Sequence, residues 1–246
     1  MLEKLNQEIK NCTKCVLHKT RNHAICGEGN LDSKLFLIPQ APGEQEDKHN
    51  KMFVGPSGKI FDELMDAAGI TRDMIYMSNL IKCKLPQNRK PKQVEIKTCS
   101  QYLDREIELL DPEFLVPLGY YSTQYLFHKY FLPQIAKSEF PDYIGKLIYK
   151  EGRKILPLTH PAALIYVNEF KDKVIENYKK LQILLHECKW YRVCPMKYFY
   201  EKGILDRKWI ELYCKGNWKE CVRYKMEVSG NYHSDRMLPN GEMMEG

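Results

Sequence analysis

Four short apolar runs, separated by longer amphipathic stretches, constrain the fold of this 246-residue chain more than any other feature. The runs comprise residues 35–38, 75–77, 114–118 and 155–158. They are apolar throughout rather than alternating, which is typical of strands in a parallel sheet covered on both faces. Helical periodicity marks residues 59–68, 94–110, 122–130 and 169–186. Strands that alternate with helices predict an α/β fold, a three-layer α/β/α sandwich with a central, mainly parallel four-stranded sheet.

Local signals mark the ends of the first two predicted helices. Ser57 is a candidate cap for the helix at 59–68, and Gly69 is a candidate stop. The pair Asp111-Pro112 ends the helix at 94–110, because the residue before a proline disfavours helical backbone.

Polar loops follow the predicted strands, beginning at Gln40, Asn79, Gly119 and Thr159. In open α/β sheets the loops after parallel strands meet at the carboxyl edge, where ligands bind. We therefore expect Gln40, Asn79 and His160 to lie at one edge of the sheet.

The composition excludes several classes of protein. Hydrophobic residues make up 43% of the chain and charged residues 28%, which is enough apolar material for a core. No apolar run reaches transmembrane length, and residues 1–10 are charged and lack the apolar region of a signal peptide. We therefore expect a cytoplasmic protein without a membrane partner. The net charge of +6 is compatible with nucleic acid binding, although many soluble proteins carry as much.

Nine cysteines without a secretory signal favour metal ligation over disulfides. Cys12 and Cys15 form a C-x-x-C pair, and Cys83 and Cys99 follow at wide spacing among the polar loops. Iron–sulfur clusters take four thiolates, which can lie far apart in the sequence if the fold reunites them. Zinc uses the same ligands, so the cysteines alone leave the metal open.

The chain changes character near residue 188, and we expect two domains, 1–187 and 188–246. The second domain holds all three tryptophans and few aliphatic runs. Its four cysteines predict a second site, for an iron–sulfur cluster or zinc: Cys188, Cys194, Cys214 and Cys221. The alternative is that these cysteines are reduced and buried in a small aromatic core. Asp206 is expected to begin a helix.

Four segments occur in an order and spacing that point to one family: P-Q-A-P-G-E-Q-E-D at 39–47, F-V-G-P-S-G at 53–58, S-N-L-I-K-C at 78–83 and L-T-H-P-A-A-L at 158–164. With Cys12, Cys15, Cys83 and Cys99, they resemble family 4 uracil-DNA glycosylases, the iron–sulfur members of their superfamily. The resemblance covers residues 12–185. It implies base excision repair by hydrolysis of the N-glycosidic bond of uracil, and a 4Fe–4S cluster held by those four cysteines. It also implies uracil-containing DNA, single- or double-stranded, as the partner, and we expect a monomer.

The sequence departs from the family pattern at two places. The first motif usually contains G-E-[A/G]-P-G, whereas here the carboxylate is replaced by the amide of Gln40. Another branch of the superfamily has Gln at this place, in G-Q-D-P-Y. Three nearby acidic residues can supply a carboxylate instead: Glu44, Glu46 and Asp47. In the last motif, Ile165-Tyr166 stands where a basic residue is more usual.

The resemblance and the chemistry of excision together assign roles to five residues. Phe53 is the candidate ring for stacking on a flipped base. The amide of Asn79 can accept and donate at once, which suits N3–H and O4 of uracil and not cytosine. The backbone at Gln40 and Ala41 contacts O2 or the attacking water. His160 donates a hydrogen bond to O2 as negative charge develops on the leaving base.

Each of these residues also has a purely structural interpretation. Phe53 can be core, Asn79 a turn former and His160 a loop residue. A basic stretch near Asn79 can contact DNA phosphates or simply be solvated: Lys82, Lys84, Arg89, Lys90 and Lys92. Two rival functions follow. The first is a uracil-DNA binding protein with weak or no turnover, and the second is a redox or metal-sensing DNA-binding protein.

Overall fold

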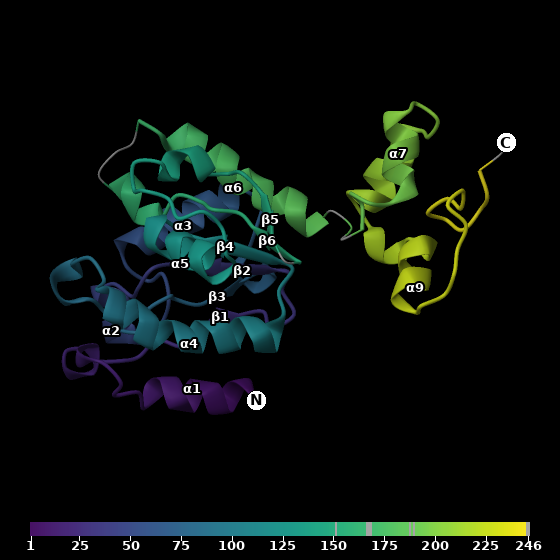
Figure 1. The fold of residues 1–246 in the computed structure, drawn as a ribbon. Helices are drawn as coiled ribbons and strands as arrows, with labels where there is room; N and C mark the ends of the chain where they lie inside the picture. The colour runs from purple at the N-terminus through teal and green to yellow at the C-terminus, as the bar shows by residue number, and fades with distance from the viewer. Residues whose placement is uncertain (151, 166–168, 187, 189, 245–246) are drawn as a thin grey trace. The chain divides into compact units, whose positions relative to one another are not determined.

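The computed structural model describes residues 1–150, 152–165, 169–186, 188 and 190–244 (Figure 1). The chain forms two compact units, residues 1–181 and 182–246. The division falls within the helix α6 (Lys171–His186), whereas the sequence places the boundary just after this helix. The predicted position Tyr166 lies outside the described residues.

The first unit is built on a six-stranded sheet with the order β1-β3-β2-β4-β6-β5. The strands are β1 (Glu28–Gly29), β2 (Leu35–Ile38), β3 (Tyr76–Met77), β4 (Phe114–Pro117), β5 (Ile148–Lys150) and β6 (Arg153–Ile155). The four inner strands are parallel, and β1 and β5 pair antiparallel at the edges. The predicted α/β fold with a mainly parallel four-stranded centre is confirmed. The two edge strands, of two and three residues, are too short to give a strand pattern in the sequence.

The helices of the first unit include the four predicted ones. The α-helices before α6 are α1 (Leu2–Lys10), α2 (Glu44–His49), α3 (Pro56–Ala67), α4 (Gln93–Leu110) and α5 (Tyr120–Lys129). Short 3₁₀ turns connect them at Val16–Lys19, Arg72–Met74, Pro86–Asn88, Phe140–Tyr143 and Pro161–Ile165.

The predicted cap of α3 is wrong, whereas its predicted stop is confirmed. Gly55 precedes α3 and Pro56 is its first residue, because the fixed φ of proline suits the first helical position. Ser57 therefore lies inside the helix. Gly69 follows the last turn with a φ of 66°, which glycine adopts without strain.

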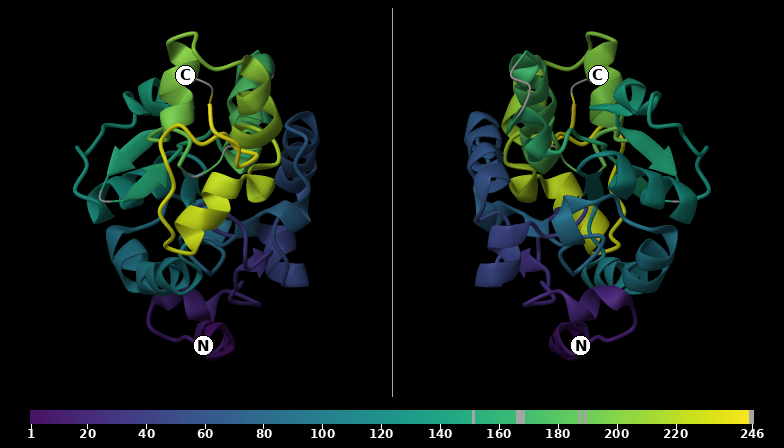
Figure 2. Two further views of the ribbon diagram at one scale, coloured as in Figure 1. Left: turned by 90° about the vertical axis from the view of Figure 1, so that its right-hand side faces the viewer. Right: turned by 90° about the vertical axis from the view of Figure 1, so that its left-hand side faces the viewer.

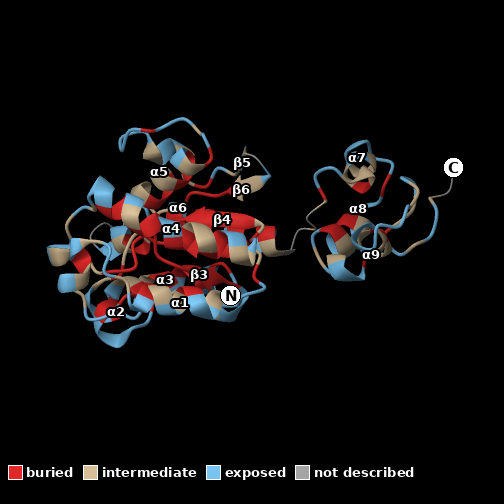
Figure 3. Cartoon of the chain, turned by 60° about the horizontal axis from the view of Figure 1, so that its bottom comes forward, coloured by how far each residue is buried: buried red, intermediate tan, exposed pale blue. Residues whose placement is uncertain are grey.

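Apolar side chains cover both faces of the sheet, whose central strands are fully buried (Figure 3). On one face, Phe36 and Ile38 of β2 pack in one cluster with Leu103 of α4 and Phe127 of α5. The alternate residues Leu35 and Leu37 point to the opposite face. Helix α1 packs against α4 at the outside of the layer, as Figures 1 and 2 show.

The second unit consists of short helices around a small core. They are α7 (Pro195–Glu201), α8 (Arg207–Trp209), a π-helical turn (Ile210–Cys214), a 3₁₀ turn (Trp218–Glu220) and α9 (Val222–Val228). The helix start predicted at Asp206 is confirmed, because its carboxylate accepts from the backbone N–H of Lys208 at 2.8 Å. Among the described residues of both units, no helix combines the length and apolarity needed to cross a membrane.

Candidate active site

Residues from three predicted loops line one hollow at the carboxyl edge of the sheet. The lining comprises Pro39, Ala41, Pro42, Gly43, Glu46, Met52, Phe53, Ser57, Asn79 and His160. The hollow has a volume of about 20 Å³, which is room for a water molecule and not for a pyrimidine. A base therefore enters only after lining side chains move.

Gln40, also predicted for this site, precedes Ala41 in the loop and is half-buried. Its backbone carbonyl accepts from Ile81 N–H at 2.9 Å, and Pro39 likewise accepts from Leu80 N–H at 2.9 Å. These bonds join the loop after β2 to the loop after β3, which is how Ala41 and Asn79 come to line the same hollow.

Asn79 is buried in the wall of the hollow, with 3% of its surface exposed. Its side-chain amide has no hydrogen-bond partner among the described residues. The amide lines a hollow in which a ligand can bind, so its donor and its acceptor are available to that ligand. The adjacent Ser78 donates to Glu106 and accepts from the buried Lys82, at 3.0 and 2.6 Å. The loop that carries Asn79 is thus fixed by buried polar contacts.

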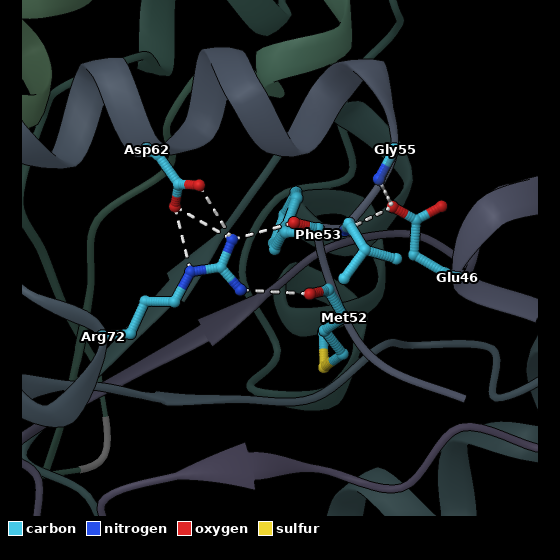
Figure 4. Close-up of polar contacts among 7 residues, drawn as sticks. Glu46, Met52, Phe53, Gly55, Asp62 and Arg72 are labelled. Atoms are coloured by element: carbon cyan, nitrogen blue, oxygen red, sulfur yellow. Dashed lines mark hydrogen bonds and ion pairs between the residues drawn. The ribbon is translucent and has the colours of Figure 1, made fainter. Parts of the chain in front are cut away.

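Phe53 lies in a turn that is held from both sides (Figure 4). Its φ of 51° is in the left-handed region that residues other than glycine rarely adopt. The carboxylate of Glu46 accepts from Val54 N–H and Gly55 N–H at 3.0 and 2.8 Å. On the other side, the guanidinium of Arg72 donates to the carbonyls of Met52 and Phe53 at 3.1 and 2.8 Å. Four backbone groups around Phe53 are therefore satisfied by two side chains.

The ring of Phe53 stacks on the ring of Phe61 in α3, with 4.1 Å between centroids and 4° between planes. Gly58 permits this approach, because a β-carbon there would lie 2.1 Å from the carbonyl oxygen of Phe53. Phe53 thus packs on Phe61 of α3 and also lines the hollow, so the structural interpretation holds and the stacking role stays a prediction.

His160 enters the hollow on the loop after β6 and is positioned through its Nδ1. This atom accepts from Ala162 N–H at 3.1 Å, so the neutral ring carries its proton on Nε2. Burial lowers the pKa of His160 to about 4, from an ordinary value of 6.5. At neutral pH the ring is therefore an uncharged donor. The carbonyl of the preceding Thr159 accepts from the hydroxyl of the buried Tyr178 at 2.9 Å.

The three candidate carboxylates have different surroundings. Asp47 is fully buried and accepts from the backbone N–H groups of Asn22 and His23, so it is a structural residue. Glu44 is exposed and does not line the hollow. Glu46 is 6% exposed and does line it. Its Oε2 faces Gly43, where a β-carbon would come within 2.5 Å.

The prediction of phosphate contacts is wrong for Lys82. Its side chain is 1% exposed, and its ammonium pairs with the buried carboxylate of Glu106 at 2.6 Å. Arg89 is also engaged, in an ion pair with Glu95 that lowers the pKa of that carboxyl. The partners Glu106 and Glu95 both lie on α4, and the sequence alone did not show that this helix packs beside the basic stretch.

The first four predicted cysteines line one pocket in the first unit, with Arg21, Lys82 and Tyr102 beside them. Arg21 donates to Cys83 Sγ at 3.0 Å, and Lys82 N–H donates to Cys99 Sγ at 3.2 Å. Burial raises the pKa of Cys83 and raises that of Cys99 to about 12. Within the described ranges, no three His, Cys, Asp or Glu side chains are arranged to hold a single metal ion. The other four predicted cysteines line a cavity in the second unit.

Comparison with known proteins defines the class to which this fold and site belong. The model of the uracil DNA glycosylase superfamily matches residues 26–182, so the chain belongs to this superfamily. The match leaves out Cys12 and Cys15 and almost all of the second unit.

Within the superfamily, similar proteins carry the name Type-4 uracil-DNA glycosylase. The protein of Sulfurisphaera tokodaii is 37% identical over 196 residues, covering 78% of this chain and 88% of the relative. That of Saccharolobus solfataricus is 38% identical over 186 residues, covering 74% and 85%. That of Thermotoga maritima is 33% identical over 184 residues, covering 73% and 92%. The chain is thus a member of the type-4 family, as the sequence motifs predicted.

Proposed function

We propose that this protein excises uracil from DNA by hydrolysing its N-glycosidic bond and leaves an abasic site. The observation that carries the proposal is the buried amide of Asn79, which faces the hollow without a partner in the described chain. The family membership supports the same reaction, since its named relatives are uracil-DNA glycosylases. The partner is uracil-containing DNA, and the protein acts as a monomer on single or double strands.

Recognition of the base falls to Asn79 and Phe53. The amide oxygen of Asn79 accepts from N3–H of uracil while its NH₂ donates to O4. Cytosine offers an acceptor at N3 and a donor at C4, so a fixed amide rejects it. The ring of Phe53 stacks on the flipped base, and the hollow opens to admit it.

Bond cleavage places negative charge on the leaving uracil, and His160 stabilises it. Its Nε2–H is free to donate to O2, because Nδ1 is already bonded to Ala162 N–H. A preorganised donor strengthens its hydrogen bond as charge develops, and the loss of one such donor costs about 10²–10³ in rate in other enzymes. The backbone at Gln40 and Ala41 orients the attacking water.

The positive charge that develops on the sugar is stabilised by Glu46 in place of the carboxylate missing at Gln40. Glu46 lines the hollow, and it is held in place through the two backbone N–H groups that its Oε1 accepts. Its carboxylate therefore serves both the Phe53 turn and the reacting centre.

Cys12, Cys15, Cys83 and Cys99 hold a 4Fe–4S cluster in this proposal. The donor set fits, since four thiols line one pocket and two of them accept N–H hydrogen bonds. The cluster supplies cross-linking rather than catalysis, because hydrolysis transfers no electrons. Bound there, it would join the N-terminal segment, through Cys12 and Cys15, to the loop that carries Asn79, through Cys83.

The test is incubation with a uracil-containing oligonucleotide followed by alkaline cleavage of abasic sites. We expect cleavage at uracil, and none in the matched oligonucleotides with thymine or cytosine. Binding to uracil-DNA without cleavage would favour the first rival function, a binding protein. Binding to DNA that is independent of the base would favour the second, a redox or metal sensor. Cys83→Ser is expected to lose iron and uracil-DNA affinity together, whereas the matched variant Cys26→Ser, outside both cysteine sets, keeps both.

A further inference from the structure

We propose that the second unit binds an iron–sulfur cluster of its own through Cys188, Cys194, Cys214 and Cys221. The four thiols line one cavity of about 270 Å³. This site lies in the part of the chain beyond residue 182, where the superfamily match ends. The donors are all thiolates once deprotonated, and such a set selects iron–sulfur clusters, zinc or copper(I) over hard cations.

The local fold brings the four cysteines together from separate turns. Cys194 directly precedes α7, Cys214 ends the π-helical turn, and Cys221 directly precedes α9. The backbone N–H of Cys188 donates to the carbonyl of Cys214 at 2.7 Å, which ties the first of the four to the third. Cys214 and Cys221 are buried, and the other two are half-buried.

A buried cation in the cavity wall is a second, independent indication that the cavity binds an anionic group. Arg223 lines the same cavity with 3% of its surface exposed. Its Nη1 donates to the backbone carbonyls of Ser234, Asp235 and Met237, at 2.7, 3.1 and 2.8 Å. Its Nε is buried without an acceptor, and no carboxylate in the described chain pairs with it.

A buried charge without a counter-charge is strongly unfavourable. An anionic tetrathiolate cluster would supply the missing negative charge. The first unit repeats this arrangement, since Arg21 donates to Cys83 Sγ within the other set of four cysteines.

The spacing of the thiols favours a cluster over a single ion. A tetrahedral zinc site needs Zn–S bonds of about 2.3 Å, which brings four thiolates close together around one point. No such group of three or more ligands exists among the described side chains, in either unit. A cluster contains several irons and so holds its ligands farther apart, as four thiols around a cavity require.

The second unit has only a small apolar core. Its buried apolar cluster consists of Tyr191, Met196, Leu205, Ile210 and Cys214. Units of this size seldom reach useful stability from a core alone, and metals commonly supply the rest. The cluster would therefore be part of the fold of residues 182–246.

Metal analysis of the anaerobically purified full-length protein tests the proposal without any substitution. We expect about eight iron and eight acid-labile sulfide per chain, from two 4Fe–4S clusters. Zinc in place of the second set of irons would overturn the proposal, as would about four iron in total with no other metal.

Paired variants separate the two sites, so that failure of the first cluster is distinguishable from failure of the second. Cys194→Ser with Cys221→Ser should lose about half of the iron and sulfide and keep uracil excision. Cys83→Ser with Cys99→Ser should lose the other half. Cys26→Ser is the control and should lose none. Unchanged iron in the Cys194/Cys221 variant would overturn the proposal.

Arg223→Gln tests the role of the buried cation. After reduction, the electron paramagnetic resonance signal of the second cluster should appear only at a lower potential, because a positive charge near a cluster favours its reduced form. The signal of the first cluster should not shift. The matched variant Arg207→Gln removes an exposed arginine that pairs with Glu211, and should change neither potential. Equal potentials for Arg223→Gln and wild type would show that Arg223 does not face the cluster.

Discussion

The guanidinium of Arg72 donates to the backbone carbonyl of Phe53 at 2.8 Å, across 19 positions of sequence. The bond holds Phe53 in a left-handed conformation that its own side chain disfavours. The same guanidinium lies over the ring of Phe61, on which Phe53 stacks. Arg72 is therefore a positioning residue for the ring that is proposed to stack on the flipped base.

Replacing Arg72 with Gln should lower uracil excision by about 10-fold or more. Hydrogen bonds from a charged donor contribute about 1.5–3 kcal/mol, and each 1.4 kcal/mol corresponds to a tenfold change. The loss should appear in kcat more than in KM, because the displaced ring misplaces the base. The control is Asp62→Asn, which removes only the exposed partner of Arg72. An exposed ion pair contributes about 0–1 kcal/mol, so the control should keep most of its activity. Equal losses in the two variants would contradict the positioning role.

Replacing Asn79 with Ala should reduce uracil excision by at least about 10²-fold, because one side chain then no longer reads two atoms of the base. The fold should persist, since the amide makes no hydrogen bond within the described chain. Excision rates and the urea midpoint of unfolding measure the two effects. Near-wild-type excision would exclude Asn79 from base recognition.

The fold was predictable from the sequence where buried elements give a recognisable pattern of apolar residues. The strand β2 is apolar throughout because helices cover both faces of the sheet, and it was placed to the residue. The edge strand β1 has two residues, Glu28 and Gly29, and leaves no pattern to detect. The position of Asn79 and His160 at the hollow was predictable because both stand in recognisable motifs after predicted strands.

Side chains that act on the site through backbone groups were not predictable. Arg72 and Tyr178 stand outside the motifs, and only the folded chain brings them to the site. At Gly119, with a φ of 87°, an added β-carbon would lie 3.2 Å from Cβ of His160. Lys82 was misassigned for a related reason. A lysine in a polar loop is usually exposed, and nothing in its surroundings in the sequence shows that Glu106 lies beside it.

The low pKa of His160 predicts how stability depends on pH. Between pH 6.5 and about pH 4 the unfolded chain protonates this histidine and the folded chain does not. Its contribution to the free energy of unfolding is therefore complete above pH 6.5 and falls as the pH decreases toward 4. The variant His160→Gln lacks this term, so its urea midpoint should fall less than that of the wild type between pH 7 and pH 5. Parallel decreases in the two proteins would contradict the lowered pKa.

The excision rate, unlike the stability, should not depend on the titration of His160. The ring donates as a neutral group, so its titration should not reduce excision between pH 8 and pH 5. His160→Gln should slow cleavage more than it weakens binding of uracil-DNA, because its hydrogen bond strengthens as the leaving group gains charge. Single-turnover rates and binding to an uncleavable analogue separate these quantities. Equal losses in both would assign His160 to binding alone.

Replacing Gln40 with Glu should raise the turnover of uracil-DNA, because it restores the carboxylate usual in the first motif beside the sugar cation. The gain depends on Glu46, which already places one carboxylate at the hollow. Glu46→Gln should lower turnover in the wild-type background and lower it less in the Gln40→Glu background. The four single-turnover rates form a double-mutant cycle. If Gln40→Glu is slower than wild type, Gln40 is a specific adaptation of this chain, and the binding-protein alternative is strengthened.

The buried pair of Lys82 and Glu106 is expected to serve both the stability of the fold and the recognition of the base. Two variants separate these roles. Both side chains are almost fully buried, and both contact the hydroxyl of Ser78, next to Asn79. Removing one partner, in Lys82→Met, leaves a buried carboxylate unpaired and should cost about 3–5 kcal/mol of unfolding free energy. Replacing both, in Lys82→Met with Glu106→Leu, should recover most of that loss, because no buried charge remains.

The double variant should nonetheless excise uracil more slowly than the wild type. Ser78 then loses both partners, and the loop that carries Asn79 is no longer fixed by polar contacts. Urea unfolding and excision rates of the three proteins measure the two effects independently. Wild-type excision by a double variant of restored stability would show that the ion pair serves the fold alone and that Asn79 is positioned by its backbone contacts.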